Sequence, residues 1–199
     1  NNPRSVFLID LDNDGDIDVL SANESDNEIA WYESNGASDP SFVQRTINNS
    51  VTGAIDVYAT DLDHDGDIDI LITNRFESNE ICLNDGEGNF SEIIVFGNKN
   101  DATIDVEIYD MNKDGNKDLI LANRNNQSNF IYLNDGNLRF NEKILFGSGK
   151  DNTRSIEIGD FNQDGFPDIA TANIKAPNVI YFGDKLLSYD FKNVFDESY

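Results

Sequence analysis

Apolar segments alternate with acidic, glycine-containing stretches along the whole chain. Each acidic stretch follows one apolar segment and precedes a second, almost continuously apolar one, which is typical of a strand buried on both faces. A third apolar segment follows a polar connection. A fourth follows a turn that in the second and third copies is rich in Asn, Asp and Gly, residues that favour tight reversal. No segment shows sustained helical periodicity, so the pattern predicts four-stranded antiparallel units.

These units recur four times. The first strand of each is predicted at residues 5–9, 56–60, 105–109 and 155–159, and the second begins directly after the acidic stretch. Third strands are predicted at 27–32, 79–84, 129–134 and 178–183. Fourth strands are predicted at 42–47, 90–96, 140–146 and 187–195.

The repeat length selects the architecture. The acidic stretches begin at Asp10, Asp61, Asp110 and Asp160, which are 51, 49 and 50 residues apart. Such a period with strand content is typical of propeller blades or of another stacked repeat, and four-stranded units at this spacing fit the propeller. We therefore predict an all-β fold, a β-propeller built from four four-stranded antiparallel blades. The expected repeats cover about 1–50, 51–100, 101–149 and 150–199 of a single domain spanning residues 1–199.

The acidic stretches read DLDNDGDID, DLDHDGDID, DMNKDGNKD and DFNQDGFPD. Positions 1, 3, 5 and 9 carry side-chain oxygens, position 7 can offer its backbone carbonyl, and glycine at position 6 allows the turn. So many carboxylates in one turn repel each other unless a divalent cation neutralises them. We predict about four Ca²⁺ ions, one in each loop. The predicted metal residues are Asp10, Asp12, Asp14, Asp16 and Asp18; Asp61, Asp63, Asp65, Asp67 and Asp69; Asp110, Asn112, Asp114, Asn116 and Asp118; and Asp160, Asn162, Asp164, Phe166 and Asp168.

Competing readings of these loops fit less well. An EF-hand needs a carboxylate at position 12, where this chain has Ser21, Ile72, Leu121 and Thr171. Magnesium prefers octahedral sites that keep several waters, so a cage of five or more protein oxygens favours Ca²⁺. Asn112 and Asn162 leave three carboxylates in the third and fourth loops, against four in the first two. We therefore predict tighter binding in the first two loops.

Charge limits the partners. The chain has 38 Asp and Glu residues against 14 Lys and Arg, a net charge of −24. Nucleic acid and anionic membranes require basic patches, so neither is an expected partner. No apolar run approaches the roughly 20 residues of a membrane helix, so no membrane insertion is expected. The chain begins without an initiator Met or a signal peptide, which suggests a processed product or an excised segment.

No residue pattern indicates catalysis. His64 is the one histidine and occupies position 4 of the second loop, where side chains face solvent. Cys82, the one cysteine, excludes an internal disulfide and lies in a predicted third strand, as does Trp31. Nucleophile elbows, phosphate-binding loops and histidine clusters are not found in the sequence. We expect a protein that is not an enzyme.

Two further features carry a family resemblance. Phe-Gly precedes the third and fourth units at Phe96-Gly97 and Phe146-Gly147. With the acidic loops, this resembles the FG-GAP repeat of integrin α-subunit propellers, and the Asn-Asp-Gly turn followed by Phe is similar to the VCBS repeat of bacterial secreted proteins. The resemblance covers essentially the whole chain, although the final residues of the FG-GAP pattern are replaced by Ala-Asn or Thr-Asn. It implies calcium in the hairpin between first and second strands, and a ligand face at the opposite end.

On that basis we expect an extracellular, calcium-stabilised binding or adhesion module that is secreted or held at the cell surface. It would recognise a glycan or protein ligand, and Arg75 and Arg124 are candidate ligand contacts because they stand in loops of the expected ligand face. Local charge pairing is the alternative role for both arginines. The alternative function is a non-catalytic accessory propeller or fragment of a secreted polysaccharide-active enzyme. Four blades can close alone, form a homo-oligomer or associate with missing blades, since an open end exposes an apolar sheet face.

Overall fold

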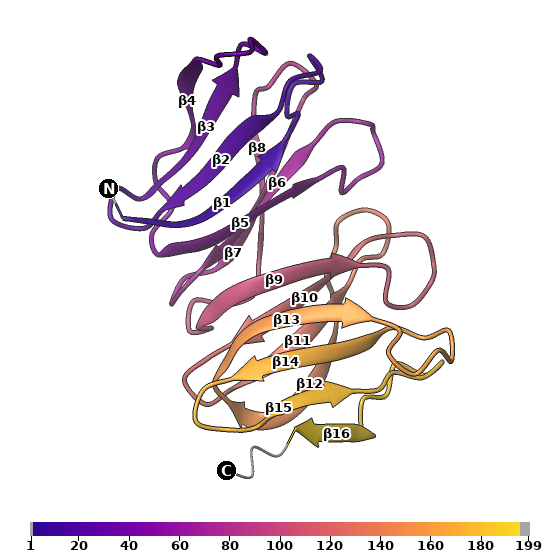
Figure 1. The fold of residues 1–199 in the computed structure, drawn as a ribbon. Helices are drawn as coiled ribbons and strands as arrows, with labels where there is room; N and C mark the ends of the chain where they lie inside the picture. Colours follow the sequence, from indigo (N-terminus) through magenta and orange to yellow (C-terminus); the bar gives the residue numbers. More distant parts are fainter. Residues whose placement is uncertain (1, 196–199) are drawn as a thin grey trace. The chain divides into compact units, whose positions relative to one another are not determined.

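The computed structural model describes residues 2–195, which form sixteen strands and no helix, so no helix there could cross a membrane (Figure 1). The chain divides into two compact units, Asn1–Asp101 and Ala102–Tyr199. Strands of the first unit are β1 (Pro3–Ile9), β2 (Asp18–Asn23), β3 (Glu28–Ser34), β4 (Phe42–Asn48), β5 (Ala54–Thr60), β6 (Asp69–Asn74), β7 (Asn79–Leu83) and β8 (Glu92–Phe96). Those of the second are β9 (Thr103–Tyr109), β10 (Asp118–Asn123), β11 (Gln127–Leu133), β12 (Glu142–Asp151), β13 (Thr153–Gly159), β14 (Asp168–Asn173), β15 (Asn178–Tyr181) and β16 (Lys192–Phe195).

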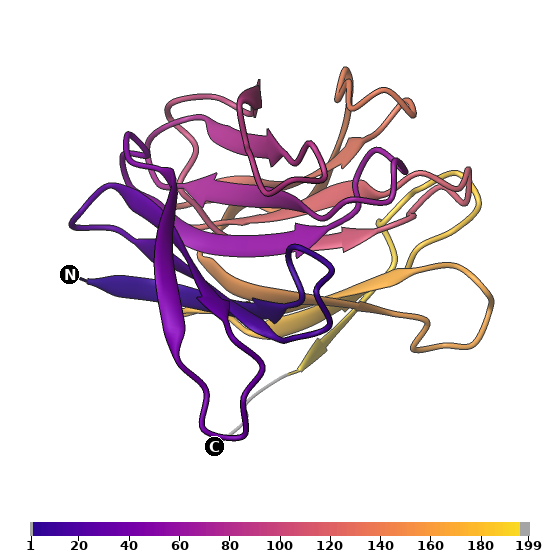
Figure 2. The same ribbon diagram turned by 90° about the horizontal axis from the view of Figure 1, so that it is seen from above.

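Each unit contains two four-stranded sheets. The strand orders are β1-β2-β3-β4 and β5-β6-β7-β8 in the first unit, and β9-β10-β11-β12 and β13-β14-β15-β16 in the second. Consecutive strands pair antiparallel throughout, so every sheet is a meander (Figure 2). The predicted all-β fold with four antiparallel blades is confirmed. The expectation of one domain over the whole chain stays a prediction.

Burial follows the apolar pattern of each blade. Every residue of β6 and of β10 is buried, which accounts for their continuous apolar sequences. First strands such as β5 include partly exposed positions, whereas β4 and β16 are largely or wholly exposed. The second strand of a blade is therefore its most deeply buried one. The acidic loop leads directly into this buried strand.

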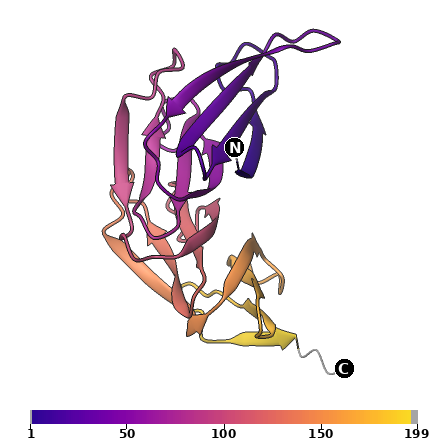
Figure 3. The same cartoon turned by 90° about the vertical axis from the view of Figure 1, so that its left-hand side faces the viewer.

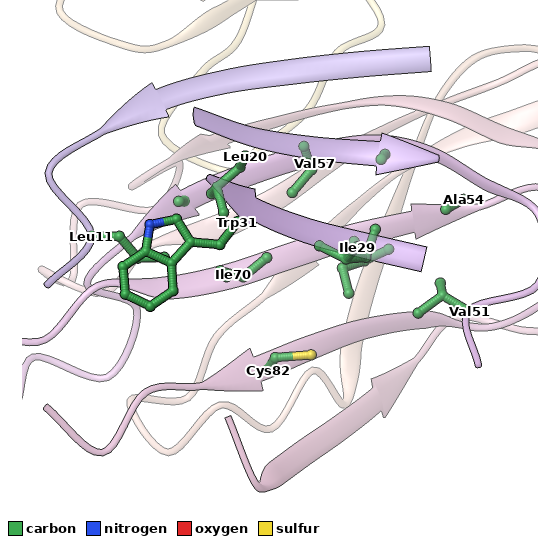
Figure 4. Packing of buried hydrophobic residues seen from close by; sticks show 12 residues of the cluster. Leu11, Leu20, Ile29, Trp31, Val51, Ala54, Val57, Ile70 and Cys82 are labelled. Carbon is green, nitrogen blue, oxygen red and sulfur yellow. The ribbon is translucent and has the colours of Figure 1, made fainter. Parts of the chain in front are cut away.

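Within each unit the two sheets share one hydrophobic core. In the first unit, Leu20, Ile29 and Trp31 of one sheet pack with Ile70 and Cys82 of the other (Figure 4). The second unit repeats this arrangement. Its core residues are Met111, Ile120, Ala122, Ile131, Leu133 and Phe146 from the third blade, with Ile156, Ile169, Val179, Tyr181 and Tyr189 from the fourth; Met111 and Tyr189 lie in loops between strands. Face-to-face packing of neighbouring blades is thus present inside both units.

The predicted fourth strands differ from those observed at their ends. The last strand begins at Lys192 rather than at residue 187, because residues 184–188 form a turn in which the Asp184 carboxylate accepts the Leu186 and Ser188 N–H groups. Leu187 has a positive φ of 55°, which a strand does not accommodate. In the first blade, β3 ends at Ser34, beyond the predicted end at residue 32, whereas β4 begins at Phe42 as predicted. Figure 3 shows the hairpin turn between them extending outward.

Candidate functional site

Each acidic loop forms the hairpin between the first and second strand of its blade. Glycine at position 6 has φ between 88° and 99° in all four loops, the left-handed region that the sequence requires there. The residue at position 4 is left-handed as well, although it is never glycine: φ is 58° at Asn13, 67° at His64, 62° at Lys113 and 61° at Gln163. Two left-handed residues fold the loop tightly back on itself. The residue types at position 4 indicated this left-handed conformation only weakly. Asn and His are enriched in it, but the Lys and Gln of the third and fourth loops are not.

Carboxylates converge in the first two loops. Ligand oxygens of Asp10, Asp12 and Asp18 lie within 4.8 Å of one another, and the same holds for Asp61, Asp63 and Asp65. In the first loop, Asp10 Oδ1 is buried without a hydrogen-bond partner. A buried carboxylate oxygen without a partner is costly, and a bound cation removes that cost. These residues fit a hard divalent cation that prefers oxygen ligands.

Backbone N–H groups hold the loop carboxylates in place. Asp10 Oδ2 accepts the Gly15 N–H at 3.0 Å, and Asp110 and Asp160 accept the glycine N–H of their loops at 2.9 Å. Burial, followed by the neighbouring charges of Asp14 and Asp18, raises the pKa of Asp12. Burial likewise raises the pKa of Asp63. The fold thus fixes the ligands before a cation arrives and leaves their repulsion for the cation to relieve.

Position 9 has a role that the sequence did not reveal. Asp18, Asp69, Asp118 and Asp168 are buried, and each uses Oδ2 to accept the N–H of position 2 in its own loop at 2.8–3.1 Å. Each Oδ1 accepts a second N–H from the end of the third strand, donated by Ser34, Asn84, Asn134 and Gly183 at 2.8–3.0 Å. Burial raises the pKa of Asp69 and of Asp118 to about 6. Position 9 therefore ties the acidic loop to the third strand and remains a candidate ligand.

The third and fourth loops differ internally from the first two. The Asn112 amide donates from Nδ2 to Asp114 Oδ2 at 2.9 Å, and Asn162 makes the same bond to Asp164 at 2.9 Å. The amide thereby partly satisfies a carboxylate that a cation would otherwise neutralise. Whether the third and fourth loops bind a metal more weakly than the first two stays a prediction.

Position 7 side chains contact the turn between third and fourth strands. Asp67 approaches Gly86 so closely that a Cβ there would lie 2.6 Å from its Oδ2, and Asn116 similarly faces Gly136 at 3.2 Å. Asp16 packs even more tightly against the glycine of its own blade. The side chains of Asp16, Asp67 and Asn116 thus contact that turn. That position 7 offers its backbone carbonyl to a metal stays a prediction. In the fourth loop, Phe166 has no side-chain oxygen, and its ring lies 5.0 Å from the Lys113 ammonium.

Comparison with known families matches the description FG-GAP-like repeat three times, at residues 10–72, 61–121 and 110–171. The chain belongs to the FG-GAP-like repeat family. Each matched segment begins at position 1 of one acidic loop and ends shortly after the next, so the acidic loops mark the period of the family. A comparison with curated proteins gave no match.

Solved structures share the fold at low identity. An Agrocybe aegerita lectin, described as specifically recognising non-reducing terminal N-acetylglucosamine, aligns with a TM-score of 0.64 and 19% identity over 95% of this chain and 51% of its own. BBS1N in complex with ARL6DN aligns at 10% identity in two structures. The mercury-soaked one has a TM-score of 0.58 over 91% of this chain and 50% of its own, and the lead-soaked one 0.59 over 91% and 53%. This FG-GAP-like repeat chain therefore spans about half the length of the structures that it matches.

A recurring asparagine holds the opposite end of the second, third and fourth blades. Asn74 donates to the Ser78 carbonyl, Asn123 to the Ser128 carbonyl and Asn173 to the Pro177 carbonyl, which closes the connection between second and third strands. In the first blade the Asn23 amide nitrogen is buried without a hydrogen-bond partner. The Oδ1 atoms of Asn123 and Asn173 accept the hydroxyls of Thr103 and Thr153, both at 2.9 Å. In the second blade Ala54 stands at the threonine position, and Asn74 Oδ1 is buried without a hydrogen-bond partner.

A polar hollow of about 500 Å³ lies at this end of the first unit. It is lined by Ser50, Thr52, Asn74, Glu77, Ser78, Glu80, Val95 and Lys99. We call this the blade-two hollow. No sequence motif indicated this hollow, because its lining comes from segments that are separated along the chain.

The candidate arginines lie in local contacts rather than in this hollow. Arg75 Nη2 pairs with Glu24 Oε1 at 2.6 Å, and the same Glu24 also pairs with Arg4. Arg124 donates to the Asn125 side chain at 3.2 Å. For Arg75 the structure thus shows the charge pairing that we had set out as the alternative to ligand contact. Whether either arginine contacts a ligand stays a prediction.

Proposed function

We propose that this FG-GAP-like repeat chain is a calcium-stabilised, non-catalytic binding module of the extracellular space or cell surface. Its ligand would be a glycan or a protein, bound at the end of the blades opposite the acidic loops. The observation that carries this proposal is the blade-two hollow, a polar concavity at that end of the first unit. The lectin among the similar structures supports a binding role through the shared fold alone.

Calcium would be held by the carboxylates and amide oxygens of the four loops, with the position 7 carbonyl. Bound there, it would supply positive charge that cancels the repulsion between clustered carboxylates. Because each loop connects the first two strands of a blade, the ion would stabilise the blade rather than act on a substrate. Low-affinity sites of this kind suit extracellular calcium concentrations, which supports the proposed location.

The lining of the blade-two hollow suits a hydroxyl-rich ligand. Hydroxyl groups of Ser50, Thr52 and Ser78 can donate and accept hydrogen bonds, and Glu77 and Glu80 add acceptors. The Lys99 ammonium lies 3.6 Å from Glu77, which leaves the lining with a net negative charge. These groups match the alternating donors and acceptors of a neutral or amino-bearing glycan better than those of an acidic one.

A glycan array at millimolar calcium tests the proposal. We expect binding to neutral or amino sugars, weakened by Glu77→Ala and unchanged by Glu87→Ala, a control in the turn between β7 and β8 at the acidic-loop end. Equal weakening by both variants, or binding confined to acidic glycans, would contradict the assignment of the hollow. Hydrolysis or elimination of any bound polysaccharide by the chain alone would overturn the non-catalytic role.

A further inference from the structure

A hollow of about 320 Å³ lies within the second unit, between the third and fourth blades at their acidic-loop end. Its lining comes from the third acidic loop, from position 7 of the fourth, and from the turn between β15 and β16. The blade-two hollow lies at the other end of its blade, so the two hollows share no residue. We call the new one the loop-end hollow, and the residues that define it are Met111, Lys113, Phe166, Asp184, Lys185, Leu186 and Leu187.

The turn that lines the loop-end hollow has a counterpart in the second blade. Asp184 Oδ1 accepts the N–H groups two and four residues further on, at 2.7 and 3.0 Å. Asp85 Oδ1 does the same at 3.0 and 3.2 Å. Leu187 has a φ of 55°, and its counterpart Gly88 has a φ of 75°. The two turns therefore have the same hydrogen bonds in the same register, and their residues can be compared position by position.

The side chains at the matched positions differ in charge and polarity. The first unit has four carboxylates and no cationic group there, from Asp12, Asn13, Asp67, Asp85, Gly86 and Glu87. The second unit has two ammonium groups, one carboxylate and two large apolar side chains, from Asn112, Lys113, Phe166, Asp184, Lys185 and Leu186. The same backbone framework thus carries an acidic surface in the first unit and a cationic, apolar one in the second. This difference indicates a ligand-binding role rather than a requirement of the fold.

Apolar side chains and an ammonium group lie together in the loop-end hollow. Lys113 Nζ donates to the Gly165 carbonyl and lies 5.0 Å from the centroid of the Phe166 ring. Met111 is 1% exposed and gives the hollow an apolar base, whereas Leu186 is 76% exposed. A ligand with an apolar body could therefore cover surface that is now in contact with water.

The charged groups of the lining leave one net positive charge. Lys113 and Lys185 are cationic, and no residue from 2 to 195 forms an ion pair with Lys185. Asp184 is the one carboxylate of the lining, and its Oδ1 already accepts two backbone N–H groups. Asp114 and Asp164 of the flanking acidic loops are close along the chain, and the calcium proposed above would neutralise them. With calcium bound, the hollow would therefore attract an anion.

We propose that the loop-end hollow binds a small organic monoanion, a carboxylate attached to an apolar body. The carboxylate would pair with Lys113 and Lys185, and the apolar body would cover Met111, Phe166 and Leu186. One net positive charge matches a carboxylate better than a doubly charged phosphate. The chain's net charge of −24 opposes binding only weakly, because charges more than about 8 Å apart are largely screened at physiological salt. The volume lies at the lower end of the range for small-molecule sites, about 300–1,000 Å³.

NMR titration of the full chain at millimolar calcium tests the proposal with three matched probes. Phenylacetate joins a carboxylate to a ring, phenylacetamide has the same shape without the charge, and acetate has the charge without the ring. We expect phenylacetate to bind several-fold more tightly than the other two, with the largest shifts at Lys185 and Leu186. Equal binding of phenylacetamide, tighter binding of inorganic phosphate, or no binding of phenylacetate would overturn the proposal. The role proposed for the blade-two hollow is unaffected by any of these results, since it uses other residues.

Variants of exposed side chains locate the site without disturbing the fold. Lys185→Gln should weaken phenylacetate binding about two- to fivefold, the contribution of one exposed charge pair. Lys175→Gln makes the same change of charge in the connection between β14 and β15, at the other end of the blade, and should have no effect. Leu186→Ser keeps both ammonium groups, so it should weaken phenylacetate binding and leave acetate binding unchanged. Equal weakening by the two lysine variants would assign the effect to net charge and contradict the proposal.

Discussion

Asp118 Oδ1 accepts a hydrogen bond of 2.9 Å from the N–H of Asn134, sixteen residues further along the chain. The other oxygen of this carboxylate accepts the Met111 N–H at 2.8 Å. An asparagine here would present an amide donor to one of the two N–H groups, so we expect Asp118→Asn to cost about 1–3 kcal/mol. Asp39→Asn makes the same change at an exposed carboxylate in the turn between β3 and β4, outside the acidic loops, and is the control that should cost less. If the two variants unfold at the same urea concentration under saturating calcium, the buried hydrogen bonds of Asp118 contribute little to stability.

Calcium should determine the thermal stability of the protein. Extracellular calcium modules have dissociation constants of roughly 0.1–1 mM. At about 10 mM free Ca²⁺, each site that forms only in the folded state adds about 1.4–2.7 kcal/mol. Four independent sites then add about 6–11 kcal/mol, comparable with the net stability of a whole domain. We expect scanning calorimetry to show a large fall in midpoint after chelation; an unchanged midpoint would exclude a structural role for the ion.

Conversion of asparagine to aspartate should strengthen the third loop. Asn112→Asp adds a fourth carboxylate and removes the amide bond to Asp114, so calcium affinity should rise on the order of tenfold. Asn125→Asp makes the same change of charge in the connection between second and third strands, at the other end of the blade, and should have no such effect. Isothermal titration of both variants separates the local contribution from a change in net charge. Equal affinities in the two variants would mean that ligand charge does not set the order of the sites.

Cys82 should report on the integrity of the first unit. Burial raises the pKa of its thiol from 9.0 to about 12, so a thiol reagent at pH 8 should react only after chelation or denaturation. A raised pKa favours the folded state while the unfolded thiol is still neutral. This contribution is full below pH 9 and is lost as the pH rises towards 12, amounting to about 1.4 kcal/mol for each pH unit in between. Urea unfolding at pH 8 and pH 10 should therefore show a steeper loss for the natural protein than for Cys82→Ala, and parallel losses would contradict the assignment.

Restoring the missing threonine should stabilise the second blade. Ala54→Thr would place a hydroxyl near the unpaired Asn74 Oδ1, as Thr103 does for Asn123. Ala54→Val has the same shape without the hydroxyl and is the matched control. We expect the threonine variant to exceed the valine variant by about 1 kcal/mol in unfolding free energy, the net value of one hydrogen bond. A valine variant of equal stability would show that Asn74 gains nothing from the hydroxyl.

The architecture could be predicted because four copies report the same pattern. Second strands such as β6 are buried on both faces, so their apolar runs are continuous, and the intervening acidic loops recur in register. Strand ends were less predictable. The turn at 184–188 depends on two hydrogen bonds accepted by the Asp184 side chain. The sequence alone does not show which aspartates of the chain accept such bonds.

The sequence identified the candidate metal ligands of the acidic loops. It did not show which of these residues also make hydrogen bonds or contacts to the rest of the blade. Five positions of each loop were assigned to the metal, yet Asp69 also accepts two backbone N–H groups and Asp67 contacts Gly86. Both relationships join the loop to a segment some fifteen to twenty residues away, and no local pattern encodes such pairings. The blade-two hollow escaped prediction for a similar reason, because Ser50, Glu77 and Lys99 of its lining are distant in sequence.

The hydrogen bonds of the position 9 carboxylate have a consequence for the history of this chain. Asp118 joins Met111 and Asn134, and Asp168 joins Phe161 and Gly183, so the hydrogen bonds of each position 9 carboxylate lie inside its own blade. A duplicated gene segment of one period therefore carries a complete set of partners with it. Adding, removing or altering one repeat therefore leaves the position 9 hydrogen bonds of the other repeats unchanged.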